Sequence, residues 1–452
     1  MKSETLAING GPRTVKSDRP LRALEWKRGL TRSFDLLRML EATLRGKTSI
    51  VNSTGIVGKF ERAFRELTGS KYALAMNNGT ATLHSAYFAV GVGPGSEVIV
   101  PAYTWHATAT PVLMCGAVPV FCEIDPKTLT LDPDDFARRI TSRTRAVAVL
   151  HAWGNPAPMD RICEIAAAHG VDVIEDCSHA HGATYKGRAV GTWGRVGCYS
   201  LQGSKAVDGG EAGVAITDDP VLYDRMLLLG HNFLVGNGGQ KANTFPGFGD
   251  ISLGVKYRPH MAAMYFAYTS LQRLQRRNER SRRAWQIVCD QLAGVPGIRP
   301  IATLPGALRG GFYAYPLEYT GADLGGLGTE EFAKAVRAEG APLEVDQFRH
   351  SLLHTVPLFT TLDRVGLGGG CYDATRPWEE NVAQATLPVT ERITERLVRL
   401  PRQFHGVPES YVRQCVAAIR KVLEATIPAK SRERAGTPPP APEARVAASG
   451  GR

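Results

Sequence analysis

A single lysine, Lys205, lies among small residues and glycines in the stretch CYSLQGSKAVDGGEAG, residues 198–213. A lysine amine becomes a nucleophile toward a carbonyl when its surroundings lower its pKa, and a Schiff base is the recurrent product. A lone lysine in a loop is much more often a solvated charge. Lys205 is therefore a candidate nucleophile that needs support from other residues.

Three further stretches supply groups suited to a planar cofactor that carries a phosphate. In NNGTATL, residues 77–83, a strand-like run gives way to a helix, and free amides beside a glycine and a threonine hydroxyl bind phosphate well. Trp105 follows the apolar run EVIVPA and could cover a flat ligand. Asp176 closes the run VDVIED and could hold a positively charged ring nitrogen, as in pyridoxal phosphate enzymes. Each feature also has an ordinary interpretation, as a turn, a packing residue or a helix cap.

Alternating apolar runs and helical patterns indicate the elements that must hold these residues. We expect strands at 97–102, 118–124, 145–153 and 171–178, with helices at 80–90 and 159–170. Strands buried on both faces and separated by helices predict a mainly parallel α/β sheet. Ligands of such sheets bind at the carboxyl ends of the strands. Trp105 and Asp176 fall at these ends.

The chain divides into four expected parts. Residues 1–59 are predicted to be an N-terminal segment that packs on a large domain, and residues 60–290 form that domain. A long helical pattern at 260–292 leads out of it, and residues 291–428 are expected to form a smaller C-terminal α/β domain. Residues 429–452, rich in Pro, Ala, Gly and Arg, are predicted to be a disordered tail.

Composition indicates a globular protein of the cytoplasm. Of the 452 residues 43% are hydrophobic and 21% charged, and no apolar run approaches the roughly 20 residues that span a bilayer. The start MKSETLAINGGPRTV lacks the pattern of a signal peptide. The eight cysteines contain no C-x-x-C pair, which favours reduced thiols. No membrane partner is therefore expected.

The net charge of +11 raises the question of nucleic acid binding. Six arginines fall in RLQRRNERSRR, residues 273–283, on a helical pattern. A solvated helix face explains such a cluster more simply. Without interleaved aromatic residues or a known module, basic charge is weak evidence, so no nucleic acid partner is expected.

The ordered motifs resemble the DegT/StrS family of pyridoxal-phosphate aminotransferases, which act on keto-sugars and keto-cyclitols. The resemblance covers roughly residues 6–427. Its motifs are NGTATL, PAYTW, VIEDCSHAHGA, YSLQGSK and GGEAG, together with LAINGGPRTV near the start and LPVTERITERLVRLP near the end. The family implies the type I aminotransferase fold, a homodimer with active sites at the interface, and pyridoxal 5'-phosphate as cofactor.

The resemblance also implies roles for individual residues. Lys205 would form the Schiff base, and Asp176 would pair with the pyridine nitrogen. His179 would contact the cofactor ring near its phenolic oxygen, and Trp105 would stack on it. Phosphate would be held by Gly79, Thr80, Ala81 and Ser200 and, from the partner subunit, by Lys256. The implied reaction is ping-pong, in which glutamate or glutamine donates an amino group that then passes to a ketone.

Two positions depart from the family pattern. Where the family has G-E-G-G after the lysine, this chain has Ala212 in GEAG, which adds one methyl group. The family's G-x-N-x-R segment is GVKYR here, so Lys256 replaces an asparagine that reaches the partner's phosphate. A lysine can serve a phosphate as a point charge. Family members that lack the lysine are dehydratases, so Lys205 favours transamination.

Several alternatives stay open. Asp176, His179 and His181 could bind a metal, although no further ligand cluster supports such a site. A regulatory or nucleic-acid-binding protein could keep the fold without turnover. The reaction could be a dehydration or an aromatizing cyclization of an amino-shikimate type. The motifs favour the cyclitol and antibiotic branch, and we expect substrate-facing variation at His151, Trp153 and the glycine-rich segment 231–250, which could be a lid or a plain surface loop.

Overall fold

The structure is a computed structural model of the full chain. It describes residues 5–21, 36–37, 39–41, 44–45, 54–231, 244–245, 253–346, 348, 351–360 and 386–435. The glycine-rich segment 231–250, for which the sequence leaves a lid and a plain surface loop both open, therefore lies almost wholly outside the described residues. Within the described part, no helix is both long enough and apolar enough to cross a bilayer.

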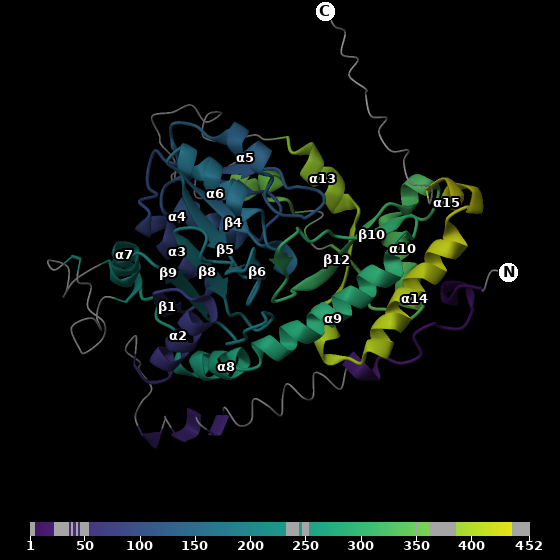
Figure 1. Ribbon diagram of the computed structural model, residues 1–452, viewed down its shortest axis with the longest axis horizontal. Helices are drawn as coiled ribbons and strands as arrows, with labels where there is room; N and C mark the ends of the chain where they lie inside the picture. Colours follow the sequence, from purple (N-terminus) through teal and green to yellow (C-terminus); the bar gives the residue numbers. More distant parts are fainter. Residues whose placement is uncertain are drawn as a thin grey trace, which may run out of the picture.

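A seven-stranded sheet in the order β1-β9-β8-β5-β4-β2-β3 forms the centre of the first lobe (Figure 1). The pairs β2–β3, β2–β4, β4–β5 and β5–β8 are parallel, whereas β9 runs antiparallel to both β1 and β8. The expected mainly parallel sheet is confirmed. The strands are β1 Tyr72–Met76, β2 Glu97–Pro101, β3 Val118–Cys122, β4 Thr144–Leu150, β5 Asp172–Asp176, β8 Val196–Ser200 and β9 Gly213–Thr217.

Helices cover both faces of this sheet. Alternate residues of each strand face opposite sides, so Val98 and Val100 enter one core while Ile99 enters another. The first core contains α3 Gly79–Ala89, α4 Thr110–Met114 and α7 Pro220–Gly230. On the other side lie α5 Pro133–Arg139 and α6 Met159–Ala168, with α2 Gly55–Thr68 and α8 Met261–Leu271 in a third core.

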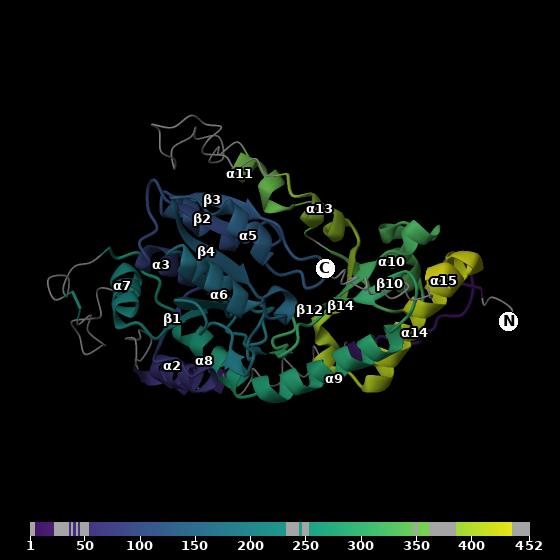
Figure 2. The same cartoon turned by 45° about the horizontal axis from the view of Figure 1, so that its top comes forward.

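A second, smaller sheet has the order β10-β12-β14-β13 and is antiparallel throughout. Figure 2 shows it beside the large sheet, with α9 running from α8 toward it. Helix α9 ends at Leu292, near the boundary expected at 290, and the domain limits stay a prediction. The elements of this part of the chain are α9 Leu274–Leu292, β10 Ile298–Pro300, β12 Ala314–Tyr319, α10 Thr329–Ala338, β13 Glu344–Val345, α11 Pro357–Thr360, α13 Pro388–Glu395, β14 Leu397–Pro401 and α14 Glu409–Thr426.

A third, small sheet consists of β6 Thr184–Tyr185, β7 Arg188–Ala189 and β11 Ala307–Leu308.

The described residues 5–21 pack on the second lobe, whereas the sequence predicts that residues 1–59 pack on the large domain. Ile56 and Val57, at the start of α2, do lie in a core of the large domain. Leu6 and Val15 are buried in the core of the second lobe. The buried carboxylate of Glu339, just after α10, accepts hydrogen bonds from the Ala7 amide at 2.7 Å and the Thr14 amide at 3.1 Å. A buried carboxylate needs such donors. The bonds hold the N-terminal segment beside α14, where both views show it in purple (Figures 1 and 2).

The predicted disordered tail also needs correction at its start. Helix α15 covers Ala429–Ala435, so disorder from residue 429 is wrong for these seven residues. The segment contains Lys430, Arg432 and Glu433, which have good helix propensity, and it follows α14 after a short break at Ile427. Residues 436–452 lie outside the described residues.

Candidate active site

Lys205 lies in the loop after β8, and its amine faces an aromatic ring. The Nζ atom is 3.9 Å from the centroid of the Tyr313 ring, just before β12. The pKa of Lys205 is about 8, below its ordinary 10.5. Burial has the largest effect and lowers the pKa, the Asp176 carboxylate raises it, and the Arg402 guanidinium lowers it. With a pKa near 8, about a tenth of the amine is neutral at pH 7, and the neutral form is the nucleophile.

Asp176 ends β5 with its carboxylate held by two neighbours. The Thr108 hydroxyl donates to Oδ2 at 2.8 Å, and the Ser178 amide donates to Oδ1 at 3.0 Å. Thr108 itself accepts from the Thr104 hydroxyl at 2.7 Å. The carboxylate is 4% exposed, and two donors fix its orientation in low dielectric. Asp176 therefore lies buried at the carboxyl edge of the sheet, and its role toward a ring nitrogen stays a prediction.

His179 is the centre of a stack of three rings. Its ring lies 4.3 Å from the Tyr313 ring with planes 10° apart, and 5.5 Å from the Trp153 ring with planes 25° apart. Burial lowers the pKa of His179 well below its ordinary value, and the charge of Lys205 adds to this effect. The imidazole is therefore neutral at pH 7 and keeps one N–H to donate.

Trp153 adopts a backbone conformation that is rare for a bulky residue. Its φ is +55°, inside the short helix η3 Ala152–Gly154 that follows β4. The indole Nε1 donates to the Tyr103 hydroxyl at 2.9 Å, and Tyr103 donates in turn to the buried Asp346 carboxylate. Such strain persists only where the surroundings hold the residue, and it gathers at functional sites. The expectation that Trp153 faces the substrate stays a prediction, because its side chain is 1% exposed.

The start of α3 packs tightly against β8. A Cβ on Gly79 would lie 2.7 Å from Cβ of Ser200, so only glycine fits. The Asn78 side chain caps the helix by accepting from the Ala81 amide at 2.7 Å. In the described hydrogen bonds, the amides of Gly79 and Thr80 have no acceptor, as expected in the first turn of a helix. These amides and the Ser200 hydroxyl form a small polar recess suited to a phosphate.

Trp105 lies outside the ring stack. Its side chain is 53% exposed, and its ring lies 6.1 Å from the Phe348 ring in an edge-to-face arrangement. It stands at the N-terminal end of helix η2 His106–Thr108, which brings Thr108 to Asp176. The stacking role expected for Trp105 stays a prediction.

Lys256 is exposed, with a φ of +61°. The next residue, Tyr257, accepts from the Asn77 amide at 2.7 Å through its carbonyl, and its hydroxyl bonds His84 Nδ1 at 2.7 Å. The segment is thereby tied to the start of α3 while the lysine faces outward. This placement suits the interface role that the resemblance implies, and the role stays a prediction.

Ala212, where the chain departs from the family pattern, is fully buried. Its methyl group belongs to the core shared with α8, and a Cβ on Gly209 would come 3.2 Å from it. Its carbonyl accepts from the Leu201 amide at 2.8 Å, which closes the base of the lysine loop. The departure from the family pattern is therefore absorbed by packing.

His151 differs from the expectation that it faces the substrate. It is fully buried, and its Nε2 lies 3.0 Å from the Glu175 carboxylate while its Nδ1 accepts from the Ala157 amide. Glu175 also accepts from the Gly191 and Gly194 amides, because adjacent strand residues point to opposite faces and Asp176 takes the site side. His151 is thus part of a structural network.

The metal alternative gains no support. Among the described residues, the one group with metal-ligand spacing is His151, Glu175 and Cys177, rather than Asp176, His179 and His181. Glu175 in that group already has three hydrogen-bond partners. Sequence reasoning also missed Tyr313 and Arg402 in the site, because both come from the second lobe, more than 100 residues away along the chain.

Comparison with known proteins identifies the family. The model of the DegT/DnrJ/EryC1/StrS aminotransferase family matches residues 35–366. The chain belongs to this family. It is accordingly an aminotransferase, and the resemblance predicted from the motifs is confirmed.

Two relatives match over most of both chains. The L-glutamine:2-deoxy-scyllo-inosose aminotransferase of Streptomyces kanamyceticus is 35% identical over 377 residues, 81% of this chain and 85% of the relative. The L-glutamine:scyllo-inosose aminotransferase of Streptomyces griseus is 33% identical over 434 residues, 93% and 98% of the two chains.

Solved structures confirm the fold. A 3-amino-5-hydroxybenzoic acid synthase superposes with a TM-score of 0.71 at 25% identity, covering 86% of this chain and 96% of its own. DesV of S. venezuelae gives a TM-score of 0.72 at 25% identity, covering 91% and 99%. The fold is therefore that of the family's aminotransferases, as the resemblance implied.

The family implies pyridoxal phosphate, and the residues present fit it. A buried carboxylate can pair with a cationic ring nitrogen, a neutral imidazole lies beside the reactive lysine, and the Gly79 recess is closed to any larger residue. The lysine amine has a lowered pKa. These groups come from the ends of β5 and β8 and the start of α3, where parallel sheets bind ligands.

Proposed function

We propose that this protein transfers an amino group from L-glutamine or glutamate to a keto-cyclitol, with pyridoxal phosphate bound to Lys205. The observation that carries this proposal is the set of four relatives, 33–35% identical, whose names specify L-glutamine and scyllo-inosose or its 2-deoxy form. They favour a keto-cyclitol over the keto-sugar alternative. The product would enter an aminocyclitol pathway of antibiotic or other secondary metabolism.

The chain's own residues divide the work. Lys205 Nζ is the nucleophile and, once released, moves a proton to and from the substrate carbon. Asp176 holds a positive charge on the cofactor's ring nitrogen, and neutral His179 donates a hydrogen bond at the ring's edge. Pyridoxal phosphate, when bound, supplies the carbonyl and an electron-withdrawing ring. A lysine with a pKa of about 8 can both donate and accept a proton at neutral pH, as the proposed steps require.

The remaining predicted residues would bind and cover the cofactor. The amides of Gly79 and Thr80 and the Ser200 hydroxyl would hold its phosphate at the start of α3, whereas the Ala81 amide, also predicted to bind it, donates to the Asn78 side chain. Trp105 would cover its ring. Lys256 would reach the phosphate of the partner subunit.

A homodimer is part of the proposal. Lys256 follows two exposed apolar residues in the chain, Leu253 at 64% and Val255 at 43% exposure. Four leucines of the described residues near the N-terminus, Leu36, Leu37, Leu40 and Leu44, are 53–79% exposed. Exposed apolar side chains gathered in this way favour a protein partner. A second copy that covers them would bring Lys256 to a neighbouring site.

We also propose a cytoplasmic location. The seven described cysteines are all free thiols, which suits a reducing compartment. For the basic helix, Arg277 and Arg282 bond inward to backbone carbonyls, so part of the cluster has a structural role rather than one in nucleic acid binding.

Half-reaction spectroscopy tests the proposal. Purified protein with pyridoxal phosphate should lose its visible absorbance band with L-glutamine, and scyllo-inosose or 2-deoxy-scyllo-inosose should restore it. Lys205→Ala should abolish both changes, with a loss of at least about 10⁴-fold in rate, whereas Lys334→Ala, an exposed lysine on α10, should leave them intact. Restoration only by a keto-sugar nucleotide would overturn the cyclitol assignment.

A second candidate reaction is an aromatizing cyclization of an amino-shikimate type or a dehydration. The similarity to 3-amino-5-hydroxybenzoic acid synthase, at a TM-score of 0.71, favours keeping the cyclization. Mass analysis of the product distinguishes the reactions, because transamination replaces a carbonyl oxygen by an amine whereas both alternatives remove water from the substrate.

A further inference from the structure

Three consecutive carbonyls around the reactive lysine accept hydrogen bonds from arginines of distant elements. A terminal nitrogen of Arg402, in the short helix η9 Arg402–Gly406 after β14, donates to the Ser204 carbonyl. A terminal nitrogen of Arg277, on α9, donates to the Lys205 carbonyl at 3.4 Å and to the Ala206 carbonyl at 3.0 Å. The carbonyls of residues 204, 205 and 206 are thus all capped from outside the sheet.

The backbone hydrogen bonds of the loop show why these carbonyls need side-chain donors. Its base is paired, because the Leu201 amide bonds the Ala212 carbonyl and the Gly203 amide bonds the Gly210 carbonyl. At its tip, within the described hydrogen bonds, no backbone amide reaches the carbonyls of residues 204–206. Partly buried carbonyls without a partner are costly, so side-chain donors must supply the bonds.

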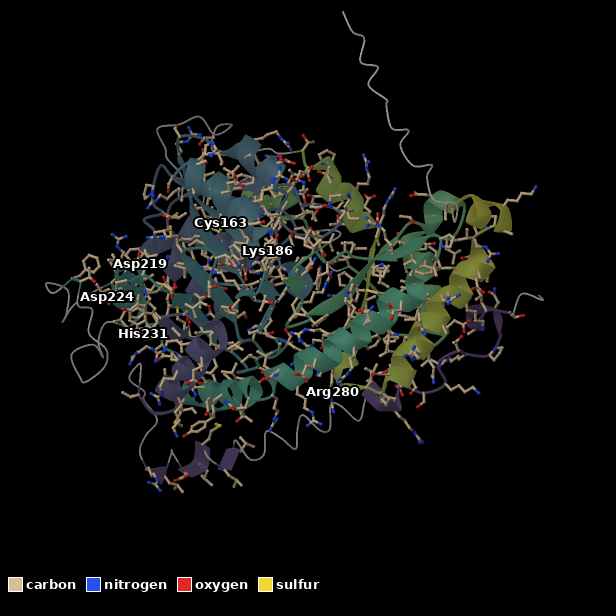
Figure 3. The ribbon with its side chains drawn as sticks, in the orientation of Figure 1. Cys163, Lys186, Asp219, Asp224, His231 and Arg280 are labelled. Atoms are coloured by element: carbon tan, nitrogen blue, oxygen red, sulfur yellow. The ribbon has the colours of Figure 1, made fainter. Side chains whose placement is uncertain are left out.

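The two arginines approach from different parts of the molecule. Arg277 lies on the helix that leads out of the first lobe, and Arg402 lies at the end of a strand of the second sheet. Arg277 is one of six arginines in the basic helix, yet it is half-buried, whereas Arg280, labelled on α9 in Figure 3, is exposed. The basic cluster therefore contains at least one residue with a specific inward contact.

We propose that Arg277 and Arg402 are positioning residues that fix the backbone of Lys205 from outside the large sheet. The proposal builds on the proposed role of Lys205 as the reactive amine. A bound guanidinium is planar and presents several donors in a fixed geometry, so it can hold a carbonyl in place more rigidly than a flexible ammonium does. Small displacements of a reacting group cost large factors in rate.

The charges that face Lys205 give the proposal an electrostatic signature. Asp176 faces it from β5, and His179 and His181 face it from the turn after β5. Tyr313 faces it from the start of β12, and the two arginines face it from α9 and η9. Among these groups, Arg402 lowers the pKa of Lys205 and Asp176 raises it. Loss of the Arg402 charge should therefore raise the pKa of Lys205 above about 8.

The test compares Arg277→Met and Arg402→Met with Arg280→Met, an exposed arginine of the same helix. In the full-length chain freed of cofactor, the rate at which an amine-reactive reagent labels Lys205 is followed against pH by peptide mass analysis. Arg402→Met should move the midpoint upward from about 8. In the cofactor-loaded enzyme, both variants should lower kcat on the order of tenfold to a hundredfold, with KM for the amino donor changed less than about twofold. Arg280→Met should change none of these values.

Conservative variants guard against misfolding. Arg277→Lys and Arg402→Lys keep the charge and lose the planar donor set, so we expect Arg402→Lys to keep the midpoint near that of the unchanged protein while kcat falls in both. Circular dichroism verifies the fold of each variant, and the Lys variants supply the result where a Met variant does not fold. An unchanged kcat in folded Arg277 and Arg402 variants, or an unchanged midpoint in Arg402→Met, would overturn the proposal. Labelling of Lys205 needs no turnover, so failure of the proposed reaction would appear separately, as activity retained in Lys205→Ala.

Discussion

Lys205 combines burial with opposing charges, and its pKa is their result. Burial disfavours the ammonium most, Arg402 adds repulsion, and Asp176 restores part of the stability of the charged form. The folded pKa of about 8 lies below the ordinary 10.5, so the amine is neutral over a pH range in which an exposed lysine is charged. A neutral amine in this range would suit the proposed role of Lys205 as the nucleophile near physiological pH.

The rate of covalent attachment of pyridoxal phosphate to the cofactor-free protein should therefore rise with pH and level off above about 8. Asp176→Asn removes the charge that stabilises the ammonium, so its midpoint should move downward, opposite to that of Arg402→Met. Stopped-flow absorbance at a series of pH values measures both midpoints. Asp290→Asn, on the far end of α9, is the matched control and should leave the midpoint in place. A midpoint near 10.5 in the unchanged protein would contradict the assignment.

At the scale of elements, the junction of α3 with β8 sets the shape of the phosphate recess. Asn78 caps the helix, and Gly79 lets its first turn approach Ser200 more closely than any side chain permits. Gly213, at the start of β9, is equally close to the Asn78 carbonyl, with room for no Cβ. Two glycines from different elements thus bring a helix start and a strand end together.

Gly79→Ala should weaken cofactor binding more than it lowers stability. The added Cβ would come 2.7 Å from Cβ of Ser200, so the helix start must shift away from β8. We expect the Kd for pyridoxal phosphate to rise by at least about tenfold, equivalent to about 1.4 kcal/mol. Equilibrium dialysis measures it, with thermal unfolding in parallel. Gly93→Ala is the control, because nothing lies within 4 Å of its Cβ position and its φ is not positive. Equal affinities in the two variants would refute this account of the recess.

At the scale of the whole molecule, Glu339 joins the N-terminal segment to the second lobe. Burial raises the pKa of its carboxyl, but hydrogen bonds from the Ala7 amide, the Thr14 side chain and amide, and Lys421 outweigh burial and leave the pKa below the ordinary value. The side chain is fully buried, and the Lys421 ammonium lies 3.1 Å from it. The segment that contains Ala7 and Thr14 is thereby fixed to α10 and α14.

Glu339→Ala should lower the free energy of unfolding by about 3 kcal/mol, because it leaves buried donors without an acceptor. Denaturant titration at pH 7 measures the loss, and Glu424→Ala, an exposed residue of α14, should cost less than about 0.5 kcal/mol. Since the folded pKa of Glu339 lies below its ordinary value, its contribution is complete at neutral pH and is lost as the pH falls through that lowered pKa. A loss equal to that of Glu424→Ala would contradict the role.

Much of the candidate site could be predicted because each of its residues is marked by a local sequence pattern. The apolar runs before Trp105 and Asp176 and the helix start at Gly79 are local signals, and parallel strands bring their carboxyl ends to one edge. The family motifs add roles to these positions. His151 was misjudged because the pattern does not reveal which face of the strand end it takes, and pairing with Glu175 turned it into the core.

The sequence by itself determined the family, the parallel sheet and the identity of the candidate nucleophile, since each depends on short-range order and residue type. Only the tertiary structure decided what surrounds Lys205. The packing of α9 and the second lobe brings Tyr313, Arg277 and Arg402 to it. Packing in the second lobe likewise brings Glu339 to the N-terminal segment. These contacts join residues separated by 71 to 332 positions. Each of these hydrogen bonds forms because a buried carbonyl or carboxylate has no donor close to it in the chain. Which groups become buried in this way depends on how the lobes pack together.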